Sequence, residues 1–434
     1  MIINYNNKIY TDNSQKANEK TIFVVSKQNE QYRQKAKENG CTQFVNSCDL
    51  KKHFDFSSIK IIGITGTNGK TTTAAAIYSI LLDLGYRVAL QGTRGFFIND
   101  QRVEEYSLTT PIQLGNFGHI QKAIENECDF FVMEVSSHAI EQNRIEGLDF
   151  ALKIHTNITQ DHLDYHNTIE EYVAVKNSFF ADESMKLINK DDPLIKFKMK
   201  NTFAYGAENK ATYKVTAYSL NDGIHVALQN FENIVHFSSP MMGYFNVSNL
   251  TAAVAAIDLL TQEPLQKICD QVENFGGVSG RMEVVSKSPL IVVDFAHTPD
   301  GMEKVFKSFN NYEIITVFGA GGDRDRSKRP IMGKIAEHFS KKVIITSDNP
   351  RFEDPDLISN DILKGTVNPE LISVELNRKV AIKNAIEVSK DFKNPVILVL
   401  GKGDEETQII YDKKFPLNDK KIVEELLITK RKSC

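Results

Sequence analysis

The sequence predicts an α/β protein with three domains. The chain has 434 residues, and at about 150 residues per domain this length suggests about three domains. Runs of β-branched residues alternate with helical segments, which is typical of parallel sheets covered by helices. A glycine-rich turn joins one of these runs to the next helical segment. We expect domain ranges of 1–58, 59–280 and 281–434.

The first range is polar and rich in Asn, Gln and Lys, and its apolar run at 21–25 predicts a strand. We expect a small α/β domain there. No basic segment followed by an apolar core opens the chain, so we see no secretion signal. The five cysteines, Cys434 among them, are scattered and form no CxxC pair, which fits a reducing compartment. We therefore expect a cytoplasmic protein.

The second range begins with a nearly continuous β-branched run at 59–65, which predicts a strand buried on both faces of a parallel sheet. A helix at 71–84 follows and ends at Gly85. Residues 201–240 alternate in short runs with turn signals, and they predict a small antiparallel patch. The remaining predicted elements are strands at 87–90, 130–135 and 150–154 and helices at 169–180 and 249–260.

The third range follows a predicted flexible joint, Gly-Gly-Val-Ser-Gly at 276–280. Strands then alternate with helices again, which predicts a Rossmann-like, doubly wound parallel sheet. The predicted strands are 290–295, 314–318, 342–346 and 396–400, and the predicted helices lie near 300–309, 329–339 and 378–390.

Composition excludes two classes of protein. The 52 Lys and Arg residues nearly balance the 56 Asp and Glu residues, for a net charge of -4. The overall charge therefore does not hold the chain to nucleic acid. No apolar stretch reaches the ~20 residues of a membrane helix. We therefore expect no nucleic-acid partner and no membrane span, and we further expect a monomer.

The turn at 66–72, Gly-Thr-Asn-Gly-Lys-Thr-Thr, has the chemistry of a phosphate-binding loop. Its glycines let backbone N–H groups approach phosphate oxygens at the positive end of a helix. Lys70 can reach the β and γ phosphates, and the Thr71 hydroxyl can bind Mg²⁺. The strict pattern has glycine where this chain has Ile64, and the alternative is a turn without a ligand. The candidate ATP contacts are Gly66, Thr67, Asn68, Gly69, Lys70, Thr71 and Thr72.

Three further features of the central range could bind a metal or a second substrate. Glu134 ends an apolar strand, where a carboxylate is costly unless it is paired or binds a cation. It is either a Mg²⁺ ligand or an exposed strand end. Residues 155–166 hold three histidines and two aspartates, in a spacing that is not a zinc pattern. They form either a metal site or a polar loop. Lys176 falls in a predicted helix, where a lysine is normally solvated.

The loop 66–72, the block 133–139 (Met-Glu-Val-Ser-Ser-His-Ala), the block 157–166 and Lys176 together resemble the Mur ligases of peptidoglycan synthesis. The resemblance covers about 59–434 and is fainter before that. It implies a cytoplasmic enzyme in which ATP, with Mg²⁺, phosphorylates the terminal carboxylate of a UDP-N-acetylmuramoyl peptide. An amine then attacks the acyl phosphate, and a tetrahedral intermediate collapses to the amide.

The resemblance also implies roles for individual residues. The implied catalytic residues are Lys70, Glu134 and Lys176. The implied metal ligands are Thr71, Glu134, His162 and Lys176, the last as a carbamate. The implied further ATP contacts are Asn249, Arg281 and Asp294, whose structural alternatives are a helix-capping Asn, a hinge-side ion pair and a strand-end Asp. The implied contacts to the UDP-sugar peptide are Ser14, Thr109, Thr110, Ser136, Gln142 and Arg144.

Three loops of the last range, 321–330, 348–351 and 401–405, each follow a predicted strand and should converge on one edge of the sheet. The resemblance implies that these loops bind the incoming amino acid. Asp-Asn-Pro-Arg at 348–351 is the motif of the diaminopimelate-adding members, and lysine-adding relatives lack its arginine. An arginine fork suits the distal carboxylate that lysine lacks. Asp404 departs from the histidine of many relatives. The implied contacts are Arg324, Asp348, Asn349, Pro350, Arg351, Gly401 and Glu405.

We therefore expect a ligase that adds meso-2,6-diaminopimelate to UDP-N-acetylmuramoyl-L-alanyl-D-glutamate. One alternative is the lysine-adding reaction, which Arg351 disfavours. Another is a folylpolyglutamate synthetase-like ligase, which the blocks 136–144 and 348–351 disfavour. A third, from another class, is a regulatory module in which ATP moves domains without ligation, and the phosphate loop alone leaves it open.

Overall fold

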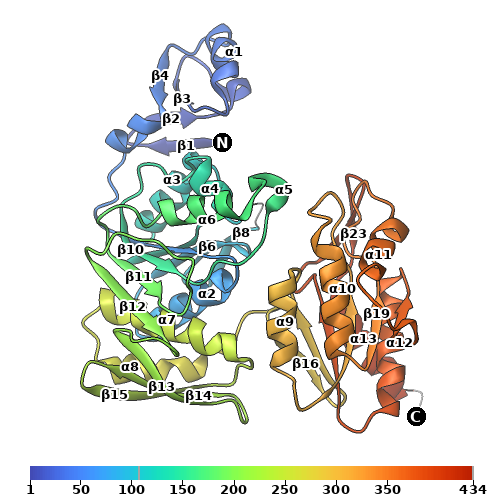
Figure 1. Cartoon of the computed structure of the whole chain (residues 1–434). Coiled ribbons are helices and arrows are strands. Elements are labelled where there is room, and N and C mark those ends of the chain that lie inside the picture. The colour runs from blue at the N-terminus through green and yellow to red at the C-terminus, as the bar shows by residue number, and fades with distance from the viewer. Residues whose placement is uncertain (106–107, 433–434) are drawn as a thin grey trace.

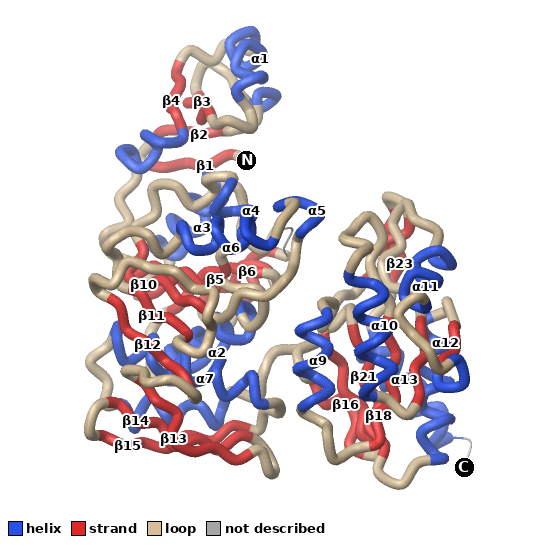
Figure 2. Tube along the Cα trace, in the orientation of Figure 1, coloured by secondary structure: helices blue, strands red, loops and turns tan. Residues whose placement is uncertain are grey.

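A computed structural model describes residues 1–105 and 108–432, with side chains up to 428, so Cys434 lies outside the described residues. The described chain folds around three sheets of four, eleven and six strands and one two-stranded hairpin. Helices cover these sheets, which confirms the predicted α/β class (Figures 1 and 2). Among the described helices, none combines the length and the apolar character that a membrane crossing needs.

The N-terminal sheet has the order β1-β2-β3-β4 and is mostly parallel, with only β1 and β2 antiparallel. The strand predicted at 21–25 is β3, whose five residues are all buried. A short helix, α1 (Arg33–Glu38), covers this sheet. The strands are β1 (Ile2–Tyr5), β2 (Lys8–Thr11), β3 (Thr21–Val25) and β4 (Gln43–Asn46).

The central sheet has the order β15-β14-β13-β12-β11-β10-β5-β9-β6-β7-β8. Its parallel middle runs from β13 to β6. The strands are β5 (Lys60–Thr65), β6 (Val88–Gly92), β7 (Gly95–Ile98), β8 (Gln101–Glu104), β9 (Phe130–Glu134), β10 (Phe150–His155), β11 (Lys186–Asn189), β12 (Thr202–Gly206), β13 (Tyr213–Ser219), β14 (Ile224–Asn230) and β15 (Asn233–Ser239). The helices are α2 (Lys70–Asp83), α3 (Gln113–Glu125), α4 (Ser137–Glu141), α5 (Leu163–His166), α6 (Ile169–Ser178), α7 (Tyr244–Leu260) and α8 (Leu265–Asp270).

The strand before the phosphate loop is buried on both faces, as its β-branched run predicts. Ile62 and Ile64 of β5 pack into the core that includes α2 and α7. Ile61 points to the opposite core, which α3 shares. Since β5 lies between β10 and β9 in the middle of the sheet, its C-terminal end places the phosphate loop beside the ends of both neighbours.

The small antiparallel patch predicted for 201–240 is confirmed for three of its strands and is wrong for the first, β12. Strands β13, β14 and β15 are antiparallel, but β12 pairs in parallel with both β11 and β13. The segment therefore extends the central sheet. Alternating residues identify strands, but they do not identify the neighbour with which a strand will pair.

The C-terminal sheet is doubly wound, as predicted, with the order β16-β17-β21-β18-β19-β20 and only β16 antiparallel. One core lies under α9, α10 and α11, and another under α12 and α13. The strands are β16 (Glu283–Lys287), β17 (Leu290–Asp294), β18 (Glu313–Phe318), β19 (Lys342–Ile345), β20 (Ile372–Val374) and β21 (Pro395–Leu400), and the hairpin is β22 (Thr407–Ile410) and β23 (Lys413–Pro416). The helices are α9 (Pro299–Lys307), α10 (Lys328–Phe339), α11 (Pro355–Leu363), α12 (Arg378–Val388) and α13 (Asp419–Lys432).

Candidate active site

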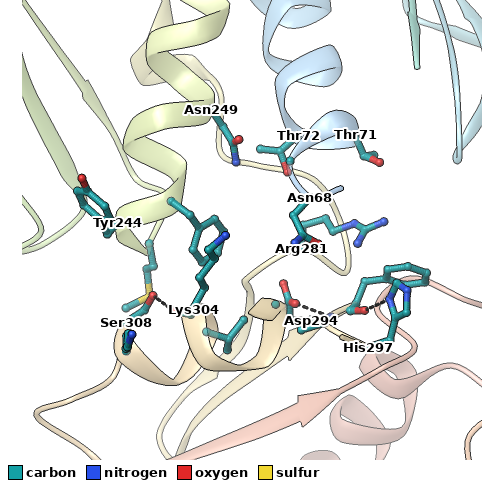
Figure 3. Close-up of a pocket in the computed structure, with 18 of the residues that line it drawn as sticks. Asn68, Thr71, Thr72, Tyr244, Asn249, Arg281, Asp294, His297, Lys304 and Ser308 are labelled. Carbon is teal, nitrogen blue, oxygen red and sulfur yellow. Dashed lines mark hydrogen bonds between the residues drawn. The ribbon is translucent and has the colours of Figure 1, made fainter. Parts of the chain in front are cut away.

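A cleft of about 2070 Å³ lies between the central and C-terminal parts of the molecule. Figure 3 shows part of its wall, where α2 and α7 face the C-terminal part that carries Asp294, His297 and Lys304. The predicted site residues that line the cleft are Thr67, Asn68, Gly69, Lys70, Thr71, Thr72, Thr109, Glu134, His162, Asn249, Arg281, Asp294, Arg324, Asp348, Asn349, Arg351, Gly401 and Glu405.

The phosphate loop is tied to the end of β10. Thr67 N and Asn68 N donate to the backbone oxygen and the side-chain oxygen of Asn157 at 2.7 and 3.0 Å. Lys70 Nζ folds back on the loop and donates to the carbonyls of Gly66 and Thr67 at 2.7 and 2.8 Å. Burial lowers the pKa of Lys70. A loop of this form presents an ammonium and a helix N-terminus to one phosphate chain.

Asn249 braces this loop from α7. Gly69 has a φ of +85° at the start of α2, and a Cβ at this position would lie 2.4 Å from Asn249 Oδ1. Thr73 Oγ1 donates to the same oxygen at 3.4 Å, and Asn249 Nδ2 donates to Asn246 Oδ1 at 2.9 Å. The helix-capping alternative for Asn249 is wrong, because α7 begins at Tyr244 and not at 249.

Glu134 is buried, with 2% of its surface exposed, so the exposed strand-end alternative is wrong. Its Oε2 accepts from Thr71 Oγ1 at 2.9 Å and from Thr93 Oγ1 at 3.2 Å, and its Oε1 accepts from Thr93 N at 2.8 Å. Thr93, which the sequence interpretation missed, holds this carboxylate in place. The contacts are all to neutral groups. A buried carboxylate beside a hydroxyl is a set of hard oxygen donors that fits Mg²⁺.

The segment 155–166 is a polar loop and not a self-contained metal cluster, because among the described residues no group of three His, Cys, Asp or Glu side chains is arranged so that it could hold a metal ion. His155 faces Asp192, with Nε2 3.2 Å from Oδ2, and His166 Nε2 lies 2.9 Å from Ser137 Oγ. His162 lines the cleft, and burial lowers its pKa to about 4. A neutral imidazole of this kind keeps a lone pair that can bind a metal.

The expectation that Lys176 is solvated is wrong. Only 1% of its surface is exposed, and its Nζ donates to Gly66 O at 2.9 Å and lies 4.8 Å from the centre of the Tyr172 ring. Burial, and next the charge of Lys70, hold the pKa of Lys176 well below its usual range. Helix α6 packs this lysine against the phosphate loop, and nothing in the sequence around it indicates that contact.

Most of the candidate contacts to the UDP-sugar peptide form one hydrogen-bonded network, of which Thr109 lines the cleft. Thr110 Oγ1 donates to Glu134 O at 2.9 Å and accepts from Ser136 N at 3.0 Å. Arg144 donates to Thr110 O and to Gln142 Oε1. Thr109 joins through Thr93, since their hydroxyls are 3.3 Å apart. Ser14 is not part of this network: it is buried in the N-terminal domain.

The three C-terminal loops converge on one sheet edge, as predicted. Arg351 Nη1 donates to Gly322 O at 2.7 Å, and Asn349 Nδ2 donates to Glu405 Oε2 at 2.9 Å. A Cβ at Gly401 would lie 2.6 Å from Asp348 Oδ2. Burial, followed by the like charge of Arg324, lowers the pKa of Arg351. Pro350 faces away from the cleft, into a second groove of about 600 Å³.

Asp294 and Arg281 shape the connection between the two halves of the cleft. Both oxygens of Asp294 accept backbone N–H groups, from Met282 and Ala296 at 2.7 Å each, and burial raises its pKa. The Arg281 guanidinium stacks 4.0 Å above the centre of the Phe295 ring. The structure therefore shows a cation–π contact where the sequence offered a hinge-side ion pair as the alternative. Figure 3 shows Arg281 between Asn68 and Asp294.

Contacts across the cleft join the two halves. Asn68 Nδ2 donates to Asp300 Oδ2 at 2.9 Å. Arg324 Nη1 lies 3.5 Å from Asp164 Oδ2. Asp404, the residue that departs from the pattern, pairs its Oδ2 with Arg94 Nε at 3.3 Å. Arg94 directly follows Thr93, so this ion pair connects the loop that carries Glu405 to the turn that holds Glu134.

The fold and the site define a multidomain protein whose phosphate loop faces a second, doubly wound domain across a cleft. The description "Mur ligase middle domain" matches residues 64–257, and "Mur ligase, glutamate ligase domain" matches residues 280–403. The chain belongs to the Mur ligase family of peptidoglycan synthesis, and the prediction of an ATP-dependent ligase is confirmed.

Two relatives show how far the similarity extends. The UDP-N-acetylmuramoyl-L-alanyl-D-glutamate–2,6-diaminopimelate ligase of Wolinella succinogenes is 52% identical over 413 residues, which cover 95% of this chain and 94% of that one. The ligase of the same name from Helicobacter pylori is 49% identical over 93% of this chain and 91% of its own.

Two solved structures share the fold. One is a structure of a ligase of that same name, with a TM-score of 0.68 and 28% identity over 97% of this chain and 95% of the other. A folylpolyglutamate synthase from Mycobacterium tuberculosis has a TM-score of 0.67 and 16% identity over 82% of this chain and 91% of its own. The second likeness concerns the fold alone.

Proposed function

We propose that this protein joins meso-2,6-diaminopimelate to UDP-N-acetylmuramoyl-L-alanyl-D-glutamate at the expense of ATP, as a cytoplasmic monomer. One observation carries the proposal. A single cleft holds the phosphate loop with buried Glu134 on one side and Arg351 with Glu405 on the other. The two 2,6-diaminopimelate ligases that are 52% and 49% identical to this chain support the choice of amino acid. We also propose that the chain has three domains, with the ranges 1–58, 59–280 and 281–434.

The first step transfers the γ-phosphoryl group of ATP to the glutamate carboxylate of the peptide. The bond between the γ phosphorus and the bridging oxygen breaks, ADP leaves with its electrons, and an acyl phosphate forms. Lys70 would turn from the carbonyls of Gly66 and Thr67 toward the phosphates and balance the charge that develops there. Asn249 would hold the loop from behind.

The donor set fits Mg²⁺, and Thr71, Glu134, His162 and a carbamate on Lys176 would hold it. When bound, Mg²⁺ supplies positive charge to the phosphate oxygens. Lys176 suits the carbamate because burial lowers its pKa and so favours the neutral form of the amine, which is the form that attacks CO₂. The amine loses a proton as the N–C bond forms, and a negatively charged carbamate takes the place of the neutral amine.

The second step joins the amine to the activated carboxyl. The amine lone pair attacks the acyl carbon, the tetrahedral intermediate expels phosphate with the bonding electrons, and the nitrogen loses a proton. Arg351 would bind the distal carboxylate and Glu405 the distal ammonium, so that the reacting amine points toward the phosphate loop. Water would destroy the acyl phosphate, and the contacts across the cleft would exclude it.

The alternatives are less well supported. The lysine-adding reaction leaves half-buried Arg351 without a carboxylate partner. A folate substrate rests on a likeness of fold at 16% identity. A regulatory module needs neither the Thr110–Arg144 network nor the C-terminal pocket.

The dependence of phosphate release on the co-substrates tests the proposal. The protein is incubated with ATP and Mg²⁺, with each co-substrate alone, and with both. We expect sustained phosphate release only when UDP-N-acetylmuramoyl-L-alanyl-D-glutamate and meso-diaminopimelate are both present. Release that is the same with and without them would contradict a ligase and favour the regulatory module.

A further inference from the structure

A fully buried lysine lies beneath the proposed amino-acid pocket. Lys402 follows β21 by two residues and has 0% of its surface exposed. Its Nζ donates to Asn349 Oδ1 at 3.0 Å, to Glu405 Oε2 at 2.7 Å and to Thr407 O at 3.0 Å. An ammonium has three N–H donors, and here each has an acceptor. The charge of Lys402 is therefore fixed at one place under the pocket floor.

This ammonium sets the orientation of two pocket side chains. Asn349 Oδ1 accepts from Lys402 and from Ile409 N at 2.9 Å, which leaves its Nδ2 to donate to Glu405 Oε2. One carboxylate oxygen of Glu405, Oε2, therefore accepts hydrogen bonds from both Asn349 and Lys402. Within the described chain, its Oε1 has no hydrogen-bond partner, and Glu405 lines the cleft with 37% of its side chain exposed. Lys402 therefore holds Oε2 of Glu405 and leaves Oε1 available to a bound amino acid.

The charge of Lys402 also balances the pocket. Asp348 and Glu405 are negative, whereas Arg351 and Lys402 are positive, so the four groups sum to zero. The nearby cations Arg378 and Arg324 have partners of their own in Asp419 and Asp164. A neutral pocket of separated charges matches an amino-carboxylate group, which is itself neutral overall. Without Lys402 the pocket would carry one net negative charge and would suit a lone ammonium better.

We propose that Lys402 is a positioning residue that sets the preference of the pocket for an amino acid with a zwitterionic distal end over one with a plain distal ammonium. It acts through Glu405 and Asn349, because its own side chain is closed off from the cleft. This inference rests on the proposed function and deepens it. Discrimination of this kind is a difference between two affinities, so it can be measured as a ratio.

The test compares kcat/KM for meso-diaminopimelate and for L-lysine in the wild type and in K402M, which removes the charge at similar volume. We expect the KM for diaminopimelate to rise at least tenfold and the diaminopimelate-to-lysine ratio of kcat/KM to fall at least tenfold. The KM for ATP should stay within about twofold. The matched control is K342M, because Lys342 begins β19 of the C-terminal sheet and, within the described chain, its Nζ donates to a backbone carbonyl, Glu370 O, and not to a pocket side chain. It should leave the ratio unchanged.

Two further variants separate charge from packing. K402Q keeps a donor for Glu405 but not the charge, and it should shift the ratio in the same direction even if K402M does not fold. If Lys402 acts through Glu405, the double variant K402M/E405Q should lose no more diaminopimelate activity than E405Q alone. A folded K402M or K402Q with the wild-type ratio would overturn the inference. It would also be overturned if the loss in K402M/E405Q equalled the product of the losses in the two single variants. A wild type that consumes no diaminopimelate would instead overturn the proposed function.

Discussion

Replacement of Lys176 by alanine is expected to lower the rate of ligation by roughly 10²- to 10³-fold, the usual cost of one charge-stabilising group at a reacting centre. The physical reason is its position. Lys176 is buried, lies 2.9 Å from the phosphate loop at Gly66 O, and has a lowered pKa. If its carbamate is the working group, a small carboxylate that diffuses into the vacated space should restore part of the rate.

Steady-state phosphate release with all three substrates measures both effects, with and without added acetate or formate. The matched control is K186A. Lys186 is also a buried lysine of the central sheet, but its Nζ donates to the backbone at Ser184 and Lys200. K186A should keep most of the activity and gain nothing from acetate. Wild-type activity in K176A, or a loss that no short carboxylate restores, would count against the carbamate.

Replacement of Arg351 by alanine is expected to raise the KM for meso-diaminopimelate by roughly 10- to 150-fold, because a hydrogen bond to a charged group contributes about 1.5–3 kcal/mol. The KM for ATP should change little, since the phosphate loop lies on the other side of the cleft. Arg351 has a φ of +52°, and alanine bears the same backbone cost as arginine there, so the change tests the guanidinium rather than the turn.

Initial rates at varied diaminopimelate and fixed saturating ATP give this KM directly. R326A is the control, because Arg326 belongs to the neighbouring loop and pairs with Glu353 at the surface, with 68% of its side chain exposed. Its KM for diaminopimelate should equal that of the wild type. If R351A also keeps the wild-type value, then Arg351 does not bind the distal carboxylate.

The parts of the fold that follow from local pattern were predictable. The β-branched run of β5 and the alternation after residue 280 identify buried parallel strands, and the glycine-rich turn between β5 and α2 identifies the phosphate loop. The parallel pairing of β12 with β11 and β13 was not predictable, because an alternating pattern identifies a strand but not the direction in which it pairs with its neighbours. The prediction also started α7 too late. Tyr244 and Asn246 precede the Ala-rich part of this helix, and the local sequence does not indicate that Asn246 is buried.

The site divides in the same way. Lys70 and Thr71 stand out because they complete the pattern of a phosphate-binding loop. Glu134 stands out because it is a carboxylate in an apolar strand. Lys176 and Lys402 do not, because a lysine in a helix or a loop is ordinarily solvated. Only the folded chain brings the first against Gly66 and the second between Asn349 and Glu405. For Asp404, likewise, the ion pair with Arg94 spans the cleft and has no trace in the local sequence.

The mass of the product formed in competition tests the central claim most directly. The protein is incubated with ATP, Mg²⁺, UDP-N-acetylmuramoyl-L-alanyl-D-glutamate and equal concentrations of meso-diaminopimelate and L-lysine. The UDP-linked products are then identified and quantified by mass spectrometry. The account predicts a UDP-tripeptide that carries diaminopimelate, with the lysine product at most a small fraction of it. A product that carries mainly lysine, or no UDP-linked tripeptide at all, would contradict it.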